Sequence, residues 1–340
     1  HKKNYRYIAD ENLLIDQIFN EKLNNLFLKE MSNNKKEEFL KDFACSVQKV
    51  YEFYFNKIIQ YTVNLNFSDK LVFSGGCALN SSANKILTEK KNIFNDVYIN
   101  YAPGDNGGAI GAALIVANKN NLKISNLKSP YLGMTYNDDD ISKILKNSKY
   151  SDKIAFEYYE EDKSLYEKIS KDISESKVIG WFQGKMEFGP RALGNRSILA
   201  DPRNPKMKDI INLKVKRRES FRPFAPVVLK DKQNEWFESN FENLYMSSIS
   251  QVKKEKKHLV PAITHIDGSA RLQSVDQNSN YKLSLLIKEF NKITKVPILL
   301  NTSFNENEPI VMKPEEAIDC ILRNDLDYLA INNFIVRKLK

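Results

Sequence analysis

Cysteine is scarce in this chain, and long apolar runs are absent from it. The 340 residues hold three cysteines, which lie far apart and form no C-x-x-C pair: Cys45, Cys77 and Cys320. An odd number of separated cysteines indicates neither a disulfide framework nor a zinc knuckle, so a reducing cytoplasm fits best. No apolar stretch approaches the roughly 20 residues that a membrane-spanning helix needs. The sequence therefore predicts a cytoplasmic protein that does not enter a membrane.

The overall composition is that of a folded protein rather than of a charged tail. Hydrophobic residues make up 42% of the chain and charged residues 28%, with a net charge of +9. These values are ordinary for globular domains, and lysine-rich runs such as 253–257 are typical of solvated faces. A chain of this length can form two domains, each with its own core.

Two strand–turn–helix units follow one another in the first part of the chain. A buried strand at 71–73 enters a Gly-Gly turn and a helix from about residue 82, and a strand at 96–100 enters a second glycine-rich turn and a small-residue helix at 109–117. Such units in succession indicate α/β architecture. The polar stretch 118–135 that follows places a domain boundary near residue 128, so the predicted domains are 1–128 and 129–340.

Hydrophobic periodicity predicts the remaining elements. Helices are expected across 10–64, including a long helix over 36–61, and at 138–146, 163–175, 231–241, 281–294 and from about 313. Strands are expected at 177–182, 296–300 and 328–331, the last of which closes the chain.

The two glycine-rich turns have the composition of phosphate-binding turns. Gly75 and Gly76 let backbone N–H groups approach a phosphate closely at a helix N-terminus, and Asn80 could bind a ribose or phosphate oxygen. In the second turn, Asp105 is flanked by glycines such as Gly107 that leave room for a ligand. A carboxylate there suits a hard metal ion or a ribose hydroxyl. The alternative is a carboxylate that caps the following helix.

Cations are concentrated in the stretch 180–229. It holds eleven Lys and Arg residues against four acids, interleaved with aromatic and aliphatic residues and with rigid Gly and Pro positions. A disordered basic tail would lack this apolar frame. Cations on a folded frame suit a bound polyanion, because Arg offers a fixed fork of donors to phosphate oxygens. A solvated basic surface and a nucleic-acid groove are the alternatives.

Several long motifs resemble one enzyme family. The segments FACSVQKVYE, LVFSGGCALNSSANKIL and YAPGDNGGAIGAAL resemble the second lobe of the actin-like (ASKHA) ATPase domain in the NodU/TobZ family of O-carbamoyltransferases. The segments EFGPRALGNRSILADPR, VKRRESFRPFAP, THIDGSARLQ and VPILLNTSFNENEPI resemble the family's carboxy-terminal YrdC-like domain. The resemblance covers nearly the whole chain in order. It implies an α/β fold with a partial ASKHA lobe followed by a YrdC-like domain that has a mixed twisted sheet.

The resemblance also implies a reaction. The YrdC-like domain is expected to make carbamoyl-adenylate from carbamoyl phosphate and ATP, and the ASKHA domain to pass the carbamoyl group to a hydroxyl of a small-molecule or sugar acceptor. Carbamoyl phosphate and ATP are both polyanions, so their binding site needs cations around the phosphates. The catalytic residues implied are Lys216 and Arg218 of a K-x-R element, with Arg191, Arg222 and Arg271. The residues implied to bind the cofactor are Gly75, Gly76, Asn80, Gly107, Arg196, and Ser303 and Asn305 of an S-x-N element.

The family's metal site is only partly represented. The resemblance assigns Asp105 as a ligand of a divalent ion, Fe or Mg, whose two His ligands come from an H-x-x-x-H motif in the first lobe. The chain has only His1, His258 and His265, without such a pair. We therefore expect this stretch alone to form the adenylate but to transfer the carbamoyl group poorly. Lys185 and His265 are weaker candidates, and His265 could orient the loop around Asp267. A homodimer is possible.

Three rival functions share parts of this pattern. A threonylcarbamoyl-adenylate enzyme of tRNA modification would need a tRNA-binding surface, which a charge of +9 does not call for. A hydrogenase-maturation carbamoyltransferase would carry an acylphosphatase domain and paired C-x-x-C fingers, which these residues lack. A nucleic-acid-binding module would use the basic stretch on backbone phosphates. Nucleic acid is not expected among the partners.

Overall fold

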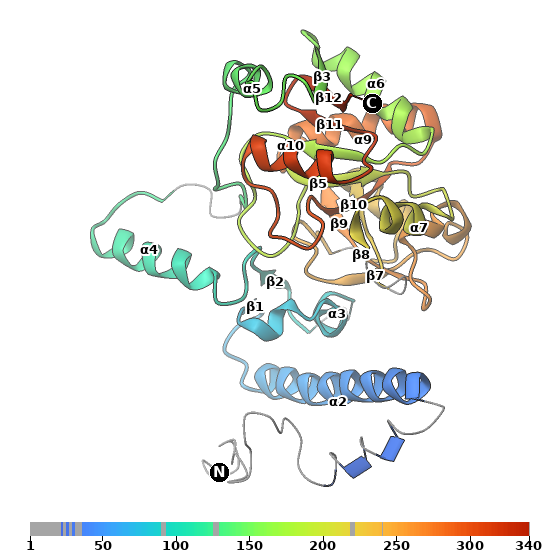
Figure 1. The fold of residues 1–340 in the computed structure, drawn as a ribbon. Helices are drawn as coiled ribbons and strands as arrows, with labels where there is room; N and C mark the ends of the chain where they lie inside the picture. The colour runs from blue at the N-terminus through green and yellow to red at the C-terminus, as the bar shows by residue number, and fades with distance from the viewer. Residues whose placement is uncertain are drawn as a thin grey trace. The chain divides into compact units, whose positions relative to one another are not determined.

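The computed structural model describes residues 22, 25–26, 29–30, 36–89, 93–124, 129–217, 222–239 and 241–339. The chain divides into two compact units, residues 1–66 and residues 67–340. In the first unit the main described element is the helix α2 (Lys36–Asn64), which confirms the long helix expected over 36–61 (Figure 1). Residues 10–21 of the expected helical region lie outside the described residues.

The second unit begins with the two expected strand–turn–helix units. Strand β1 (Lys70–Phe73) leads through a short 3-10 turn into α3 (Ser81–Glu89), and β2 (Asp96–Ile99) leads into α4 (Gly107–Lys119). The two strands are parallel, with Phe73 opposite Ile99. Because parallel strands end at the same edge, the two glycine-rich turns lie next to each other.

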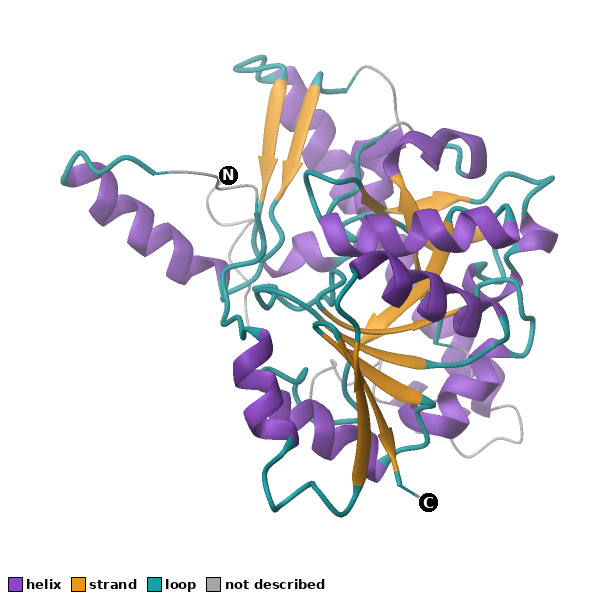
Figure 2. Cartoon of the chain, turned by 90° about the horizontal axis from the view of Figure 1, so that it is seen from above, coloured by secondary structure: helices purple, strands orange, loops and turns teal. Residues whose placement is uncertain are grey.

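A large mixed sheet of eight strands forms the rest of the unit, in the order β3-β12-β11-β4-β5-β10-β6-β9. Two neighbouring pairs, β4 with β11 and β6 with β9, are parallel, and the others are antiparallel. Figure 2 shows the twist of this sheet and the helices that cover it. The strand bounds are β3 (Ile154–Tyr158), β4 (Ile179–Phe182), β5 (Arg196–Ala200), β6 (Ala225–Leu229), β9 (Gln273–Val275), β10 (Ile298–Ser303), β11 (Tyr328–Ile331) and β12 (Phe334–Lys338).

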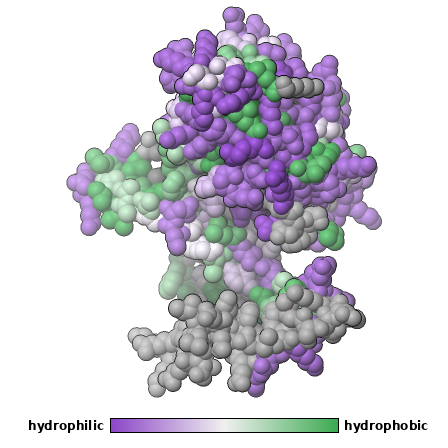
Figure 3. All heavy atoms as spheres, in the orientation of Figure 1, coloured by the Kyte–Doolittle hydropathy of each residue, from purple (hydrophilic) through white to green (hydrophobic). Residues whose placement is uncertain are grey.

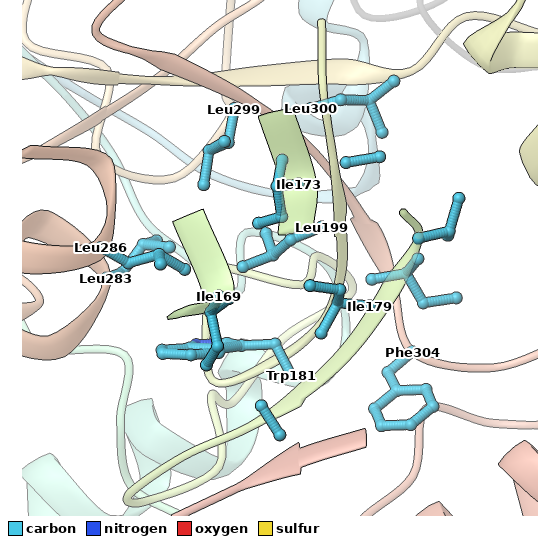
Figure 4. Close-up of a cluster of buried hydrophobic side chains, with 14 of the residues drawn as sticks. Ile169, Ile173, Ile179, Trp181, Leu199, Leu283, Leu286, Leu299, Leu300 and Phe304 are labelled. Atoms are coloured by element: carbon cyan, nitrogen blue, oxygen red, sulfur yellow. The ribbon is translucent and has the colours of Figure 1, made fainter. Parts of the chain in front are cut away.

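Helices α6 (Asp162–Ser174) and α9 (Tyr281–Thr294) pack side by side, and α9 also packs on β6 and β10. Their apolar stripes meet the sheet in the core shown in Figure 4, which includes Ile169, Ile173, Leu283, Leu286, Trp181, Leu199 and Leu299, all fully buried. A separate two-stranded pair joins β7 (Ile249–Gln251) to β8 (Ser269–Arg271). The other helices are α5 (Asp138–Leu145), α7 (Met207–Ile211), α8 (Gln233–Trp236) and α10 (Pro314–Arg323).

The expected elements and the observed ones differ at several places. The helix expected over 231–241 is wrong in extent, because α8 ends at Trp236 and the backbone is extended at Phe237. The chain closes with β12 and not with β11, because a tight turn at Asn332 brings the last residues back beside β11. Strands β3, β5, β6, β7, β8, β9 and β12 were not expected. Among them, β5 and β6 are buried along their whole length and lack the alternation that identifies a strand.

Candidate functional site

A buried lysine joins two distant parts of the second unit. Lys216 lies at the end of a short π-helical segment, Asn212–Lys216, and is only 3% exposed. Its ammonium donates hydrogen bonds to the carbonyl oxygens of Ser303 (2.6 Å) and Asn305 (2.7 Å), and to the Asn305 side-chain Oδ1 (2.8 Å). The Ser303 Oγ lies 3.1 Å away. The structure thus brings together the Lys of the K-x-R element and both polar residues of the S-x-N element.

The sheet explains why these residues meet. Strand β10 ends at Ser303, and the Ser303 hydroxyl donates to Asn305 Oδ1 at 2.7 Å, which closes the turn after the strand. Strand β6 begins at Ala225, opposite Asn301 of β10, so the segment that carries Arg222 arrives at the same end of the sheet. Arg217 is in the left-handed region and pairs with Glu306 at 3.4 Å. Arg218 lies outside the described residues.

Arg271 lines a small cavity beside this end of the sheet. The cavity has a volume of about 200 Å³, and its walls include Ser81 and Ser82 of α3, Pro223 and Phe224 ahead of β6, and His265 and Arg271 around β8. It therefore lies between the helix of the first glycine turn and the strands of the large sheet. A volume of this size admits a small anion but is below the range of roughly 300–1,000 Å³ typical of drug-sized ligands.

A polar relay forms one wall of this cavity. The Ser269 hydroxyl donates to Asp267 Oδ1 at 2.7 Å, and His265 Nδ1 lies 3.1 Å from the same hydroxyl oxygen. Burial of the Asp267 carboxyl favours its neutral form, but hydrogen bonds from the Ser269 hydroxyl and backbone N–H outweigh burial and lower the pKa of Asp267. His265 and Asp267 thus both contact the Ser269 hydroxyl. This is consistent with the suggested role of His265 in orienting the loop around Asp267.

Arg196 is held by the protein itself. Its side chain is fully buried, and its guanidinium donates to the carbonyl oxygens of Gln183 (2.8 Å), Asn195 (2.9 Å), Gly184 and Met134. It also stacks on the Phe182 ring, 3.5 Å from the centroid. Burial lowers the pKa of Arg196 to about 10. These contacts favour a structural role, and the nucleotide contact implied by resemblance stays a prediction.

The two glycine turns pack against the GPRALG loop. The Gly75 N–H donates to Pro103 O at 2.6 Å, and a Cβ on Gly107 would lie 2.1 Å from Ala102 O. Gly189 has φ +125°, and a Cβ there would lie 2.5 Å from Tyr101 O, so no larger residue allows this approach. Arg191, in the same loop, reaches Leu79 O at 3.5 Å, and burial lowers its pKa. Its guanidinium therefore contacts the first glycine turn.

The remaining predicted residues lie in these turns. Asn80 accepts the Ala83 N–H at 3.1 Å, which caps the start of α3. Asp105 is exposed, and Asn106 rather than Asp105 occupies the N-cap of α4. Within the described ranges, no group of three or more His, Cys, Asp or Glu side chains is placed to hold a metal ion. The metal role of Asp105 stays a prediction.

Glu187 is a site residue that sequence reasoning missed. This buried carboxylate accepts the backbone N–H of Leu193 at 2.6 Å and those of Asn195 and Arg196 at 3.2 and 3.3 Å. It therefore holds the loop that carries Arg191 and the start of β5. The signal was present: Glu187 opens the motif EFGPRALGNR, as one of four acids in a stretch of eleven cations.

No helix among the described residues is long and apolar enough to cross a membrane. This agrees with the absence of long apolar runs in the sequence.

Comparison with known proteins identifies relatives across most of the chain. A family model described as "Carbamoyltransferase C-terminus" matches residues 170–338, and one described as "Carbamoyltransferase N-terminus" matches residues 1–114. An uncharacterized Synechocystis protein is 38% identical over 329 residues, covering 87% of this chain and 52% of the relative.

Two relatives are named nodulation proteins. Nodulation protein NolNO of Sinorhizobium fredii is 39% identical over 88% of this chain and 44% of the relative. Nodulation protein NolO of Bradyrhizobium diazoefficiens is 37% identical over 88% of this chain and 55% of the relative. This chain spans about half the length of these curated relatives. A crystal structure of full-length HypF in a phosphate- and nucleotide-bound form matches 50% of this chain and 25% of its own, at 16% identity and a TM-score of 0.34, which is too weak a likeness to support an inference.

Proposed function

The chain belongs to the carbamoyltransferase family, and from that premise we propose that its large-sheet region activates carbamoyl phosphate with ATP. Water cleaves carbamoyl phosphate to carbamate and inorganic phosphate. A carbamate oxygen then attacks the α-phosphorus of ATP, which forms carbamoyl-adenylate and breaks the bond to pyrophosphate. In the complete protein, an acceptor hydroxyl attacks the carbamoyl carbon and releases AMP.

The observation that carries this proposal is the cluster of Lys216, Ser303 and Asn305. It places a buried cation at the end of the sheet where the segment of Arg222 also arrives. An ammonium has three donors, and Lys216 faces four acceptors, so we assign it to fixing the S-x-N turn and supplying positive charge. We then assign the contacts to the phosphates to the arginines, because a planar guanidinium can donate two hydrogen bonds to phosphate oxygens.

Separate residues suit the transfer step. Gly75, Gly76 and Gly107 lie in adjacent turns at the ends of parallel strands, a position typical of nucleotide phosphate sites. Asp105, exposed in the second of these turns, suits a divalent ion such as Fe or Mg. An ion there would polarise the acceptor hydroxyl or the carbamoyl oxygen.

The burial of two of the eleven cations in the basic stretch weakens the case for a nucleic-acid-binding module. Arg196 is fully buried and Lys216 is 3% exposed, so two of its cations are inaccessible to a nucleic-acid backbone. Electrostatic binding to such a backbone needs cations at the surface.

The test separates the two steps in the full-length protein. We expect exchange of labelled pyrophosphate into ATP that depends on carbamoyl phosphate, and we expect Arg218→Ala to lower it about 100-fold, as for other electrostatic donors. Carbamoylation of a polyol or aminoglycoside acceptor is measured separately. The absence of carbamoyl phosphate-dependent exchange in the folded wild type would refute the proposal.

A further inference from the structure

One residue that lines the small cavity beside β8 has a polar side-chain atom that the protein leaves without a partner. His265 Nε2 is buried and makes no hydrogen bond in the structure. His265 is among the residues that line the cavity of about 200 Å³. A buried polar atom without a partner is costly, and at a cavity wall it indicates a ligand group that pairs with it.

The relay behind His265 determines what kind of partner Nε2 needs. The Ser269 hydroxyl has one hydrogen, which it donates to Asp267 Oδ1 at 2.7 Å. The Ser269 oxygen, 3.1 Å from His265 Nδ1, must then accept the Nδ1–H. A neutral imidazole protonated at Nδ1 has only a lone pair at Nε2. His265, a residue that lines the cavity, therefore carries an unpaired hydrogen-bond acceptor at Nε2.

Burial of the ring is the main reason that it stays neutral. Burial, together with the nearby Lys208 and Arg271 and against the opposite effect of Asp267, lowers the pKa of His265 to about 4. Lys208 donates to Thr264 O at 3.1 Å, next to His265 in the chain. At neutral pH the Nε2 atom is thus an acceptor on a residue that lines the site, whose other charged lining residues are the anionic Asp267 and the cationic Arg271.

An acceptor beside a cation matches a carbamoyl group. We infer that His265 Nε2 accepts a hydrogen bond from the NH₂ of the bound carbamoyl group and so selects carbamoyl phosphate over acetyl phosphate. The inference rests on the proposed function. The two phosphates have nearly the same shape, but the acetyl group places a methyl where the carbamoyl group has its N–H donors. A site built around a hydrogen bond rejects the analogue that lacks it, because the buried acceptor is then left unpaired.

The kinetic test compares substitutions of His265 in the full-length protein. His265→Phe removes the acceptor, whereas the amide oxygen of His265→Gln can replace it near the Nε2 position. The ratio of the Ki of acetyl phosphate to the KM of carbamoyl phosphate is measured by pyrophosphate exchange. We expect this ratio to fall about 10- to 100-fold in the Phe variant, mainly through a higher KM, and to stay within about threefold in the Gln variant.

The exposed His258, on the turn Lys257–Leu259, gives a matched control. His258→Gln should leave the ratio unchanged, and thermal unfolding shows whether each variant is folded. A folded Phe variant with the wild-type ratio would overturn the inference and leave the proposed function standing. A wild type without carbamoyl phosphate-dependent exchange would instead remove the proposed function.

A second measurement does not depend on turnover. In protein labelled with ¹⁵N-histidine, the His265 Nε2 resonance should have the shift of an unprotonated, pyridine-like nitrogen. Carbamoyl phosphate should move it in the direction of a hydrogen-bonded nitrogen, and acetyl phosphate at matched saturation should not. Equal movement with both ligands, or a protonated Nε2 in the free protein, would contradict the inference even if the Phe variant failed to fold.

Discussion

The two parts of the second unit differ sharply in how much of their apolar surface is buried. In residues 67–124, Val72 of β1 is 73% exposed, and no residue of α4 is buried, with Ile115 and Val116 each 59% exposed. The apolar side chains of α4 are visible at the surface in Figure 3. In residues 129–339, every residue of β4, β5, β6 and β11 is buried.

This contrast separates a part that is stabilised by its own core from a part that depends on contacts outside itself. A two-stranded sheet is marginal alone, because it has little apolar area to bury. The first part is joined to the second by a small apolar cluster, in which Tyr101 packs with Leu193 and Tyr245, and by polar contacts. Asn84 of α3 donates to Ser247 O at 2.7 Å, and the Thr88 and Ser248 hydroxyls lie 2.8 Å apart. We therefore expect the large sheet to determine global stability.

The largest effect on activity is expected at Lys216. Replacing it with Met leaves the partly buried oxygens of Ser303 and Asn305 without their shared donor, which costs about 3 kcal/mol of stability. Carbamoyl phosphate-dependent pyrophosphate exchange should fall by about 100-fold. Lys206→Met is the control, since Lys206 is exposed in the same basic stretch. Denaturant unfolding and exchange are measured on both. Equal behaviour of the two variants would show that the cluster has no special role.

The next prediction compares a substitution in each of the two parts directly. Leu299→Ala in β10 deletes a fully buried side chain and should cost about 2–5 kcal/mol of unfolding free energy. Val72→Ala in β1, where the side chain is 73% exposed, should cost less than about 0.5 kcal/mol. Urea unfolding followed by tryptophan fluorescence reports the difference, because both Trp181 and Trp236 lie in the large-sheet region. A large loss for Val72→Ala would mean that β1 has a buried environment in solution.

A pH-dependent loss of stability should follow from His265. Its folded-state pKa of about 4 lies below the ordinary value of 6.5, so the unfolded chain binds more protons between those values. The stabilisation is present above about pH 6.5 and is lost as the pH falls towards 4, by at most about 3 kcal/mol. The unfolding free energies of wild type and His265→Gln are compared at both ends of this window. The contributions of the carboxylates to the pH dependence are nearly the same in the two proteins and largely cancel in the difference. A difference that is constant with pH would contradict a depressed pKa.

The sequence predicted the helices and the glycine turns better than the large sheet. The period of α9 and the turns at Gly75 and Gly107 are local signals, and α9 begins and ends where its pattern does. Strands β5 and β6 lie within the basic stretch 180–229. Both are buried on their two faces, so they lack the alternation of apolar and polar residues that identifies a strand.

The site residues, like the elements of the fold, could be predicted only in part. Resemblance indicated Lys216, Ser303 and Asn305, and the structure brings these three together. It could not distinguish Arg196, whose guanidinium faces backbone carbonyls, from arginines with other surroundings. It also did not assign roles to Glu187 or Ser269, because those roles depend on backbone N–H groups and on neighbours that only the fold defines.

The smallest effect tests the contact between the two parts. Gly189→Ala should cost roughly 1–3 kcal/mol, because φ +125° is strained for any other residue and the added Cβ would meet Tyr101 O at 2.5 Å. Gly108→Ala in α4 is the matched control, since a Cβ there meets nothing within 4 Å. Hydrogen exchange should show that Gly189→Ala speeds opening of β1, β2 and α3 while β10 stays protected. If β10 and β1 instead lost protection together, the two parts would unfold as one cooperative unit, and the difference in burial would not be a difference in stability.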